Sequence, residues 1–326
     1  MRVLVTGASG LLGGAVARAL RGRGEDVTTF QRGASGLPGR DLRGDVTDAA
    51  AVHNAVRGQD AVVHLAARVS VTGPRRAFED TNVNGTANVV AAARASQSVR
   101  RLVFVSSPSV AHSGVSLVGA GAGAAEPARA RGHYARSKAA AELLALAADG
   151  PSLAVVAVRP HLVWGPGDTQ LVGRIVARAR AGRLMLVGRG LALMDCTYVD
   201  NAAEAIVAAL DRAVISHGQA VVVSNGEPRP VAEVLARICT AAGVPAPTRH
   251  VPLGLARTGG GLIESVWALL GRTDDPPMTR FLAEQLATAH WFDQRVTREL
   301  LDWSPAVGLD EGFARLARWY AANPAS

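Results

Sequence analysis

Tyr134 and Lys138 are the residues whose types and spacing most directly suggest chemistry. They lie four residues apart in Tyr-Ala-Arg-Ser-Lys, at the start of an alanine-rich stretch, so one helix face would carry both the phenol and the ammonium. A free tyrosine has a pKa of about 10, and an adjacent ammonium is expected to lower that pKa. The pair is therefore suited to exchange a proton with a substrate oxygen near neutral pH.

The composition of the chain supports this interpretation. Lys138 is its sole lysine, whereas the other 34 basic residues are arginines. An arginine's planar, permanently charged fork does not replace a compact ammonium. Only three tyrosines are present, at positions 134, 198 and 320. Two rare residue types at helical spacing indicate a functional pair.

A glycine-rich turn, TGASGLLG, follows the first expected strand and opens a helix. Gly7 would permit the tight turn, Gly10 would let the backbone approach a pyrophosphate, and Gly13 would allow close helix–strand packing. Unpaired N–H groups at the helix start would attract the phosphates. The turn predicts a dinucleotide site, to which Ser9 and Leu11 also contribute.

The end of the second expected strand decides which dinucleotide is bound. Enzymes that use NAD place a carboxylate there for the ribose 2′-hydroxyl, and enzymes that use NADP place a basic residue nearby. Here the strand ends in Gln31, which cannot repel a 2′-phosphate, followed by Arg32, which can pair with one. We therefore expect NADP (NADPH), with NAD as the alternative.

Short β-rich runs alternate with alanine-rich helical stretches in the first half of the chain. We expect strands at Arg2–Thr6, Asp26–Phe30, Ala61–Leu65, Leu102–Ser106 and Leu153–Arg159. We expect helices near 11–23, 48–57, 80–97 and 135–149. This order predicts an α/β fold, a Rossmann-type doubly wound parallel sheet with its ligand crevice at the carboxyl ends of the strands.

After Pro160 the alternation becomes irregular. We expect residues 1–165 to form the dinucleotide-binding domain and residues 166–326 to form mainly a smaller C-terminal substrate lobe. A strand near 220–224 would still join the main sheet. The glycine- and alanine-rich residues 114–125 are expected to form either a mobile loop near the site or a plain surface excursion.

Composition excludes several classes of protein. The net charge is +8 and the pI about 10.7, but the arginines are scattered and no basic run is interleaved with aromatics, so we expect no nucleic-acid partner. Cys196 and Cys239 form no CxxC or His-paired cluster, which predicts neither a disulfide framework nor a metal site. Without a signal-peptide pattern or an apolar run of ~18 residues, we expect a cytoplasmic protein.

Several motifs together resemble the extended short-chain dehydrogenases, within them the 3β-hydroxysteroid dehydrogenase branch. These motifs are TGASGLLG, HLAA, NVNGT, SSPSV, YARSK and RPHLVWGPGD. More narrowly, RPHLVWGPGDTQLV, RARAGRLMLVG, TYVDNAAEA, SNGEP and MTRFLAEQL resemble bacterial 2-alkyl-3-oxoalkanoate reductases of olefin and β-lactone biosynthesis. The resemblance implies NADPH-dependent reduction of a 2-alkyl-3-keto acid to the 3-hydroxy acid.

The resemblance also assigns residues. It makes Ser107 the third catalytic residue beside Tyr134 and Lys138, as the donor to the substrate carbonyl, although Ser106 and Ser109 are rivals on physical grounds. It places the adenine against Asp45 and Val46. The dinucleotide would also contact Ala66, Tyr134, Lys138 and Pro160.

An apolar keto substrate agrees with the C-terminal lobe. Leu253–Leu270 could line an acyl channel, dock a pathway enzyme or rest on a membrane surface, or it could be ordinary core. We also expect a homo-oligomer. Three alternatives stay open: a 3β-hydroxysteroid or sterol dehydrogenase, a nucleotide-sugar epimerase, and a regulator that binds NADP without turnover. A dehydratase would need an acidic pair after the strand-end serine, where Pro108 and Ser109 stand instead.

Overall fold

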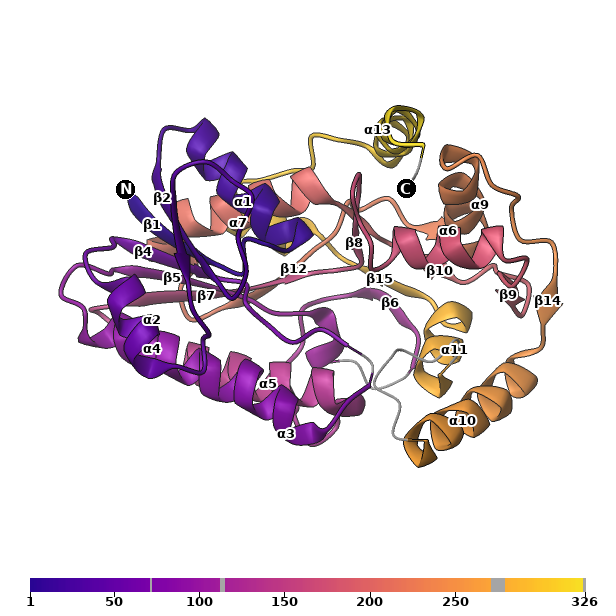
Figure 1. Cartoon of the computed structure of the whole chain (residues 1–326), viewed down its shortest axis with the longest axis horizontal. Helices are drawn as coiled ribbons and strands as arrows, with labels where there is room; N and C mark the ends of the chain where they lie inside the picture. The colour runs from indigo at the N-terminus through magenta and orange to yellow at the C-terminus, as the bar shows by residue number, and fades with distance from the viewer. Residues whose placement is uncertain (71, 112–114, 271–278, 325–326) are drawn as a thin grey trace.

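A seven-stranded parallel sheet forms the centre of the molecule (Figure 1). The computed structural model describes residues 1–70, 72–111, 115–270 and 279–324. The strands lie in the order β12-β7-β5-β4-β1-β2-β3. Their bounds are β1 Arg2–Thr6, β2 Asp26–Gln31, β3 Arg40–Arg43, β4 Ala61–His64, β5 Arg101–Val105, β7 Ala154–Pro160 and β12 Ala220–Val223. This order reverses between β1 and β4, where a doubly wound sheet opens its ligand crevice.

Helices cover both faces of the sheet, as Figure 1 shows. On one face lie α1 (Leu11–Gly22) and α7 (Val199–Asp211), packed on each other. On the other lie α2 (Ala49–Val56), α4 (Gly85–Ala95) and α5 (Gly132–Leu146). Central strands such as β4 are buried along their whole length, which explains why their sequences are continuous apolar runs. The predicted fold class is confirmed.

The five predicted strands all occur, within one residue at each end. The strand predicted near 220–224 also joins the sheet, beside β7. Sequence analysis missed the edge strand β3, because RDLR carries three charged residues and little apolar pattern. The helix predicted near 80–97 begins earlier, at α3 (Arg75–Phe78), and passes through a π-helical turn η1 (Glu79–Asn84) before α4.

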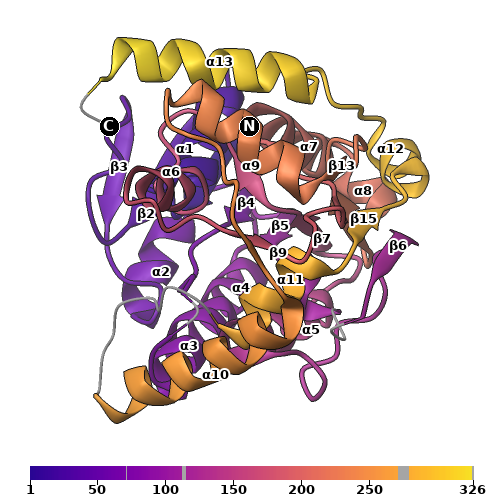
Figure 2. The ribbon, with the colours of Figure 1, turned by 90° about the vertical axis from the view of Figure 1, so that its right-hand side faces the viewer.

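The C-terminal lobe lies beyond the carboxyl ends of the sheet strands (Figure 1). Its four-stranded sheet has the order β13-β10-β15-β6. Its strands are β6 Leu117–Ala120, β10 Leu193–Met194, β13 Arg229–Pro230 and β15 His290–Phe292. Two further sheets have two strands each: one pairs β8 Val163–Trp164 with β11 Thr197–Tyr198, and the other pairs β9 Leu186–Val187 with β14 His250–Val251. The helices that remain are η2 Pro108–Val110, α6 Val172–Arg180, α8 Ala213–Ser216, α9 Val231–Ala241, α10 Leu253–Leu269, α11 Arg280–Ala287, α12 Arg295–Leu301 and α13 Leu309–Ala322. Figure 2 shows α13 running along one side of the molecule, where it packs on α9.

The structure contradicts part of the prediction that residues 114–125 form a loop. Leu117–Ala120 forms β6, which pairs in parallel with β15 of the lobe, so the loop prediction is wrong for these four residues. Residues 121–125 are in neither a helix nor a strand. Gly114 of that segment and Met278 of the last motif lie outside the described residues. Among the described residues, no helix is both long and apolar enough to cross a membrane.

Candidate active site

Lys138 lies one turn after Tyr134 on α5, fully inside the protein. Its side chain is 3 % exposed. The ammonium donates a hydrogen bond to the carbonyl of Val105 at the end of β5, over 2.7 Å, and lies 4.1 Å from the centre of the Phe104 ring. Burial lowers the pKa of Lys138 to about 7, and the carboxylate of Glu142 opposes that change. The sole lysine of the chain is thus held where it can change charge near neutral pH.

Ser107 is the serine that the structure brings to Tyr134. It caps η2 directly after β5, and its side chain is near enough to the phenol to act on the pKa of Tyr134. Ser109 bonds to Ser107 over 3.0 Å, and the hydroxyl of Ser106 is buried without a hydrogen-bond partner among the described residues. The structure therefore groups Ser107, Tyr134 and Lys138, and their catalytic roles stay predictions.

The pKa of Tyr134 differs from our expectation. Burial of the phenol raises its pKa, and the polar Ser107 side chain only opposes that rise. We expected Lys138 to lower this pKa, but its ammonium is bound to the Val105 carbonyl. A protonated phenol is the form that can give a proton to a substrate oxygen.

Asn82 supports this group and was missed as a site residue, although it lies in the NVNGT motif. It is 1 % exposed, within the π-helical turn η1, a type of turn that is frequent at functional sites. Its side-chain oxygen accepts from the Arg68 N–H over 2.7 Å, and its amide donates to Ser137 over 2.9 Å. Ser137 in turn donates to the carbonyl of Tyr134 over 2.9 Å. Asn82 thus ties the first turn of α5 to the segment that follows β4.

The glycine-rich turn has the shape that a dinucleotide requires. Gly7 has a φ of +78°, and a Cβ added there would come within 2.8 Å of the Ala66 nitrogen. A Cβ at Gly13 would lie 2.3 Å from the Gly7 carbonyl oxygen, whereas one at Gly10 would meet only that oxygen at 3.5 Å. The protein's own packing therefore requires glycine at 7 and 13 but not at 10. No side chain caps α1 at Gly10, so its first N–H groups suit a phosphate.

The other residues expected to bind the dinucleotide lie along the same edge of the sheet. Ser9 is exposed and Leu11 half-buried in the turn. Ala66 donates its N–H to Thr6 Oγ1 over 3.0 Å. His64, at the end of β4, lies between the hydroxyls of Thr6 and Thr86, and burial lowers its pKa to about 3. His64 is therefore a packed, neutral residue.

Asp45 and Val46 follow β3, and Pro160 ends β7. The Asp45 carboxylate accepts from the N–H and the hydroxyl of Thr47, each over 2.9 Å. Val46 is buried, and its carbonyl accepts from Asn88 over 2.9 Å. Pro160 is buried beside β12. All three lie at the carboxyl edge of the sheet, where the crevice is expected.

Asp41 is a second residue that sequence analysis missed, because the strand carrying it was not predicted. It lies beside Gln31 and accepts hydrogen bonds from the Gln31 amide, from Thr29 over 2.7 Å and from the Ser35 N–H over 3.1 Å. Burial tends to raise the pKa of Asp41, but these bonds outweigh it and the pKa is lowered. A carboxylate thus lies beside the end of β2 after all, while Arg32 is exposed.

The family of the chain follows from comparison with known proteins. Residues 3–224 match the model of the NAD dependent epimerase/dehydratase family. The chain belongs to this family. The matched region contains the glycine-rich turn, the Ser107–Tyr134–Lys138 group and, apart from Arg2, the whole seven-stranded sheet. The chain is accordingly an NAD(P)-dependent enzyme of the oxidoreductase/epimerase type.

Curated relatives extend the likeness into the lobe. The 2-alkyl-3-oxoalkanoate reductase of Stenotrophomonas maltophilia is 42 % identical over 99 % of this chain and 100 % of its own. The reductase of the same name from Shewanella oneidensis is 39 % identical over 96 % of this chain and 84 % of its own. An Arabidopsis thaliana 3beta-hydroxysteroid-dehydrogenase/decarboxylase (isoform 2) is 32 % identical over 84 % of this chain and 50 % of its own.

Solved structures confirm the fold of this family member. The crystal structure of gox2253 superposes with a TM-score of 0.78 at 23 % identity, covering 98 % of each chain. MoeE5 in complex with UDP-glucose and NAD superposes with a TM-score of 0.75 at 24 % identity, covering 99 % of this chain and 100 % of that one. Identities this low support the architecture alone.

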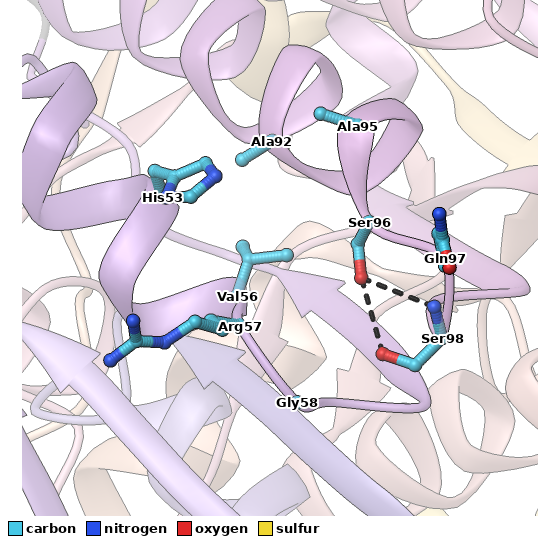
Figure 3. A pocket seen from close by; sticks show the side chains of 9 residues that line it. All are labelled: His53, Val56, Arg57, Gly58, Ala92, Ala95, Ser96, Gln97 and Ser98. Atoms are coloured by element: carbon cyan, nitrogen blue, oxygen red, sulfur yellow. Dashed lines mark hydrogen bonds between the residues drawn. The ribbon is translucent and has the colours of Figure 1, made fainter.

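Figure 3 shows a surface hollow between the C-terminal ends of α2 and α4. It is lined by His53, Val56, Arg57, Gly58, Ala92, Ala95, Ser96, Gln97 and Ser98. Gly58 and Ser98 precede β4 and β5, so the hollow lies at the amino ends of the strands. It is at the opposite edge of the sheet from Ser107 and Tyr134, and it is no part of the candidate site.

Leu253–Leu270 forms α10 and the residue after it. Ala256 is buried, in a cluster that includes Ala283 of α11. Five large apolar side chains of the helix and its end are instead exposed by 46–86 %: Leu255, Leu262, Val266, Leu269 and Leu270. Their spacing places them on one helix face. The interpretation of this stretch as ordinary core is wrong for that face.

Proposed function

We propose that this enzyme reduces a 2-alkyl-3-oxoalkanoate to the corresponding 3-hydroxy acid with NADPH. One observation carries the proposal. The likeness to the two reductases of that name runs over at least 96 % of the chain, so it includes the lobe beyond the carboxyl ends of the strands as well as the catalytic group. In folds of this kind the loops and helices around the crevice determine which substrate binds, whereas the sheet mainly supports them.

The residues of the site would share the work of a carbonyl reduction. A bound nicotinamide supplies the hydride that such a reaction needs. Ser107 would donate a hydrogen bond to the substrate carbonyl and hold it in place. The neutral Tyr134 would give its proton to the oxygen as negative charge develops there. Lys138 would supply positive charge beneath the site and hold the ribose hydroxyls.

The preference for NADPH rests on Arg32. It is exposed directly after β2, where a guanidinium can pair with a 2′-phosphate. Arg32→Asp should lower kcat/KM with NADPH far more than with NADH, and Arg57→Asp, an exposed arginine at the opposite edge of the sheet, should not. If the ratio of kcat/KM for the two cofactors stays unchanged in Arg32→Asp, Arg32 does not read the phosphate.

A nucleotide-sugar epimerase is the alternative, and the name of the family includes epimerases. Sequence relatives favour the reductase, because the structures with sugar nucleotides are at most 24 % identical. The purified enzyme should oxidise NADPH with a long-chain 2-alkyl-3-keto acid and leave UDP-sugars and a 3β-hydroxysteroid unchanged. Turnover of a UDP-sugar or the steroid, but not the keto acid, would refute the proposal. Absence of turnover with any ketone would favour a regulatory protein.

A further inference from the structure

A buried ion pair lies one helical turn from the catalytic lysine. Arg159, in β7, and Glu142, in α5, are each 1 % exposed. Arg159 Nε donates to Glu142 Oε2 over 2.8 Å and Nη2 donates to Oε1 over 2.5 Å, so the guanidinium grips both carboxylate oxygens. Arg159 also directly precedes Pro160, the last residue of β7. Moving two charges out of water costs free energy. The presence of this ion pair in the core therefore points to a role other than stability.

Glu142 acts on Lys138. The two residues are four apart on α5, on the same helix face, and the carboxylate raises the pKa of Lys138 against the larger lowering by burial. The other titratable groups of this part of the molecule do not supply negative charge. His64 from β4 is neutral, Tyr134 on α5 is protonated, and Arg159 from β7 is a cation. Besides the Val105 carbonyl and the Phe104 ring, which hold the ammonium, Glu142 is therefore the negatively charged group that favours a charged Lys138.

Arg159 has a second set of partners. Its Nη1 donates to the carbonyl of Ala122 and, over 3.1 Å, to that of Gly123. These carbonyls lie in the segment that joins Ser107 to Tyr134 along the chain, just after β6 has paired with β15 of the lobe. One buried guanidinium thus connects the catalytic helix, the end of β7 and the segment that returns from the substrate lobe.

We propose that Glu142 and Arg159 are positioning residues of the active site, which keep Lys138 charged and lock the returning segment against α5. The proposal rests on the role given to Lys138 in the proposed function. Neither residue is assigned contact with the substrate or with the dinucleotide. Each acts through others: Glu142 through the charge on Lys138, and Arg159 through the segment at Ala122 and Gly123.

The composition of the chain allows a direct test of the first half. Because Lys138 is the sole lysine, protein labelled with carbon-13 at the lysine Cε carbon gives one signal, whose shift with pH reports the titration of Lys138 without cofactor or substrate. The wild-type midpoint should lie near the pKa of about 7 given above. In Glu142→Gln it should fall by about one pH unit, because an opposite charge has been removed.

A matched control separates this effect from any general loss of charge. Glu79→Gln removes an exposed carboxylate from η1, which packs on α5, and should leave the Lys138 midpoint unchanged. Glu142→Gln leaves Arg159 buried without its partner charge and could fail to fold. The double variant Glu142→Leu/Arg159→Met replaces the pair by apolar side chains of similar size, a change that proteins often tolerate. Its midpoint should fall too, but by less than in Glu142→Gln, because the Arg159 cation is removed together with the carboxylate. A midpoint that falls in neither folded variant would overturn the charge role.

The second half is tested by amide hydrogen exchange. In Arg159→Lys a single ammonium can pair with Glu142 but cannot also reach both loop carbonyls. Peptides that cover 120–124 should then exchange about tenfold faster than in the wild type, while peptides from β4 keep their rates. Unchanged exchange at 120–124 would refute the locking role.

Both measurements are made on the protein alone, so they are independent of the proposed reaction. A failure to reduce any 2-alkyl-3-keto acid would sink the proposed function and leave these results standing. With an active enzyme, Glu142→Gln should also move the fall of kcat/KM with rising pH to lower pH. Activity should return at pH 6, where Lys138 regains its proton. A purely structural role for Glu142 would lower kcat/KM equally at every pH.

Discussion

The carboxyl edge of the seven-stranded sheet and the C-terminal lobe are built in different ways. At the sheet edge, Lys138 and Asn82 are 3 % and 1 % exposed and are held by short hydrogen bonds to main-chain atoms. In the lobe, strands are two to four residues long, and α10 leaves a row of large apolar side chains exposed. Under the proposed function, the type of reaction would depend on the tightly held residues at the sheet edge, whereas the choice of substrate would depend on the short strands and the exposed helix of the lobe.

The largest effect that would test this contrast is the loss of the proton donor. Tyr134→Phe keeps the ring and removes the hydroxyl, so kcat should fall by about 10²- to 10⁴-fold. Binding of NADPH, measured by fluorescence titration, should change little. Full activity in this variant would show that the residues at the sheet edge do not carry out the proton transfer. The assignment of the chemistry to the sheet edge rather than to the lobe would then be wrong.

A pair of glycine substitutions should sharpen the same contrast. Gly13→Ala places a methyl group 2.3 Å from the Gly7 carbonyl oxygen, so it should destabilise the fold by about 1–3 kcal/mol, measured by denaturant unfolding. Gly10→Ala meets no such obstacle and should unfold like the wild type. It should nevertheless bind NADPH more weakly, because the methyl group points where the phosphates are expected. Equal stability of the two variants would contradict the packing argument.

Much of the seven-stranded sheet and of the glycine-rich turn could be predicted from sequence, and the reasons are physical. The buried strands are continuous apolar runs, and the glycines at 7 and 13 are required by contacts within the turn, so both leave strong patterns. The edge strand β3 leaves none, because half of its surroundings are solvent. Asp41 was missed along with that strand, and its approach to Gln31 depends on the register of β2 and β3.

The supporting residues were missed for another reason. Asn82, Glu142 and Arg159 act through contacts between elements far apart in the chain, such as Asn82 with Ser137. No helical or strand periodicity encodes such a contact. The pair Tyr134 and Lys138 could be found because its two members lie one helical turn apart. Ser107 could be ranked above its neighbours only by resemblance, until the structure brought it to Tyr134.

A smaller effect, on cofactor preference, is expected at the end of β2, where the adenosine part of the dinucleotide is expected to bind. Asp41→Asn keeps the size of the side chain, loses one accepting oxygen and removes a negative charge beside Gln31. Affinity for NADPH should therefore rise about threefold to tenfold relative to NADH at low salt. Asp26→Asn removes the same charge from the other end of β2 and should change neither affinity. Dissociation constants from fluorescence titration test this. An unchanged ratio in Asp41→Asn would mean that Arg32 alone sets the preference.

The smallest effect is expected on α10. Leu262 and Leu269 are 69 % and 86 % exposed, so replacing both by Ser should change the free energy of unfolding by no more than about 0.5 kcal/mol. The control is Ala283→Ser on α11, which places a hydroxyl at a fully buried position and should destabilise the protein clearly. If the double variant unfolds as readily as that control, the exposed face of α10 is covered in solution. A melting temperature of the wild type that rises with protein concentration would then identify a second copy of the chain as the cover. The lobe would in that case be completed by assembly, and the contrast with the self-sufficient sheet would become sharper.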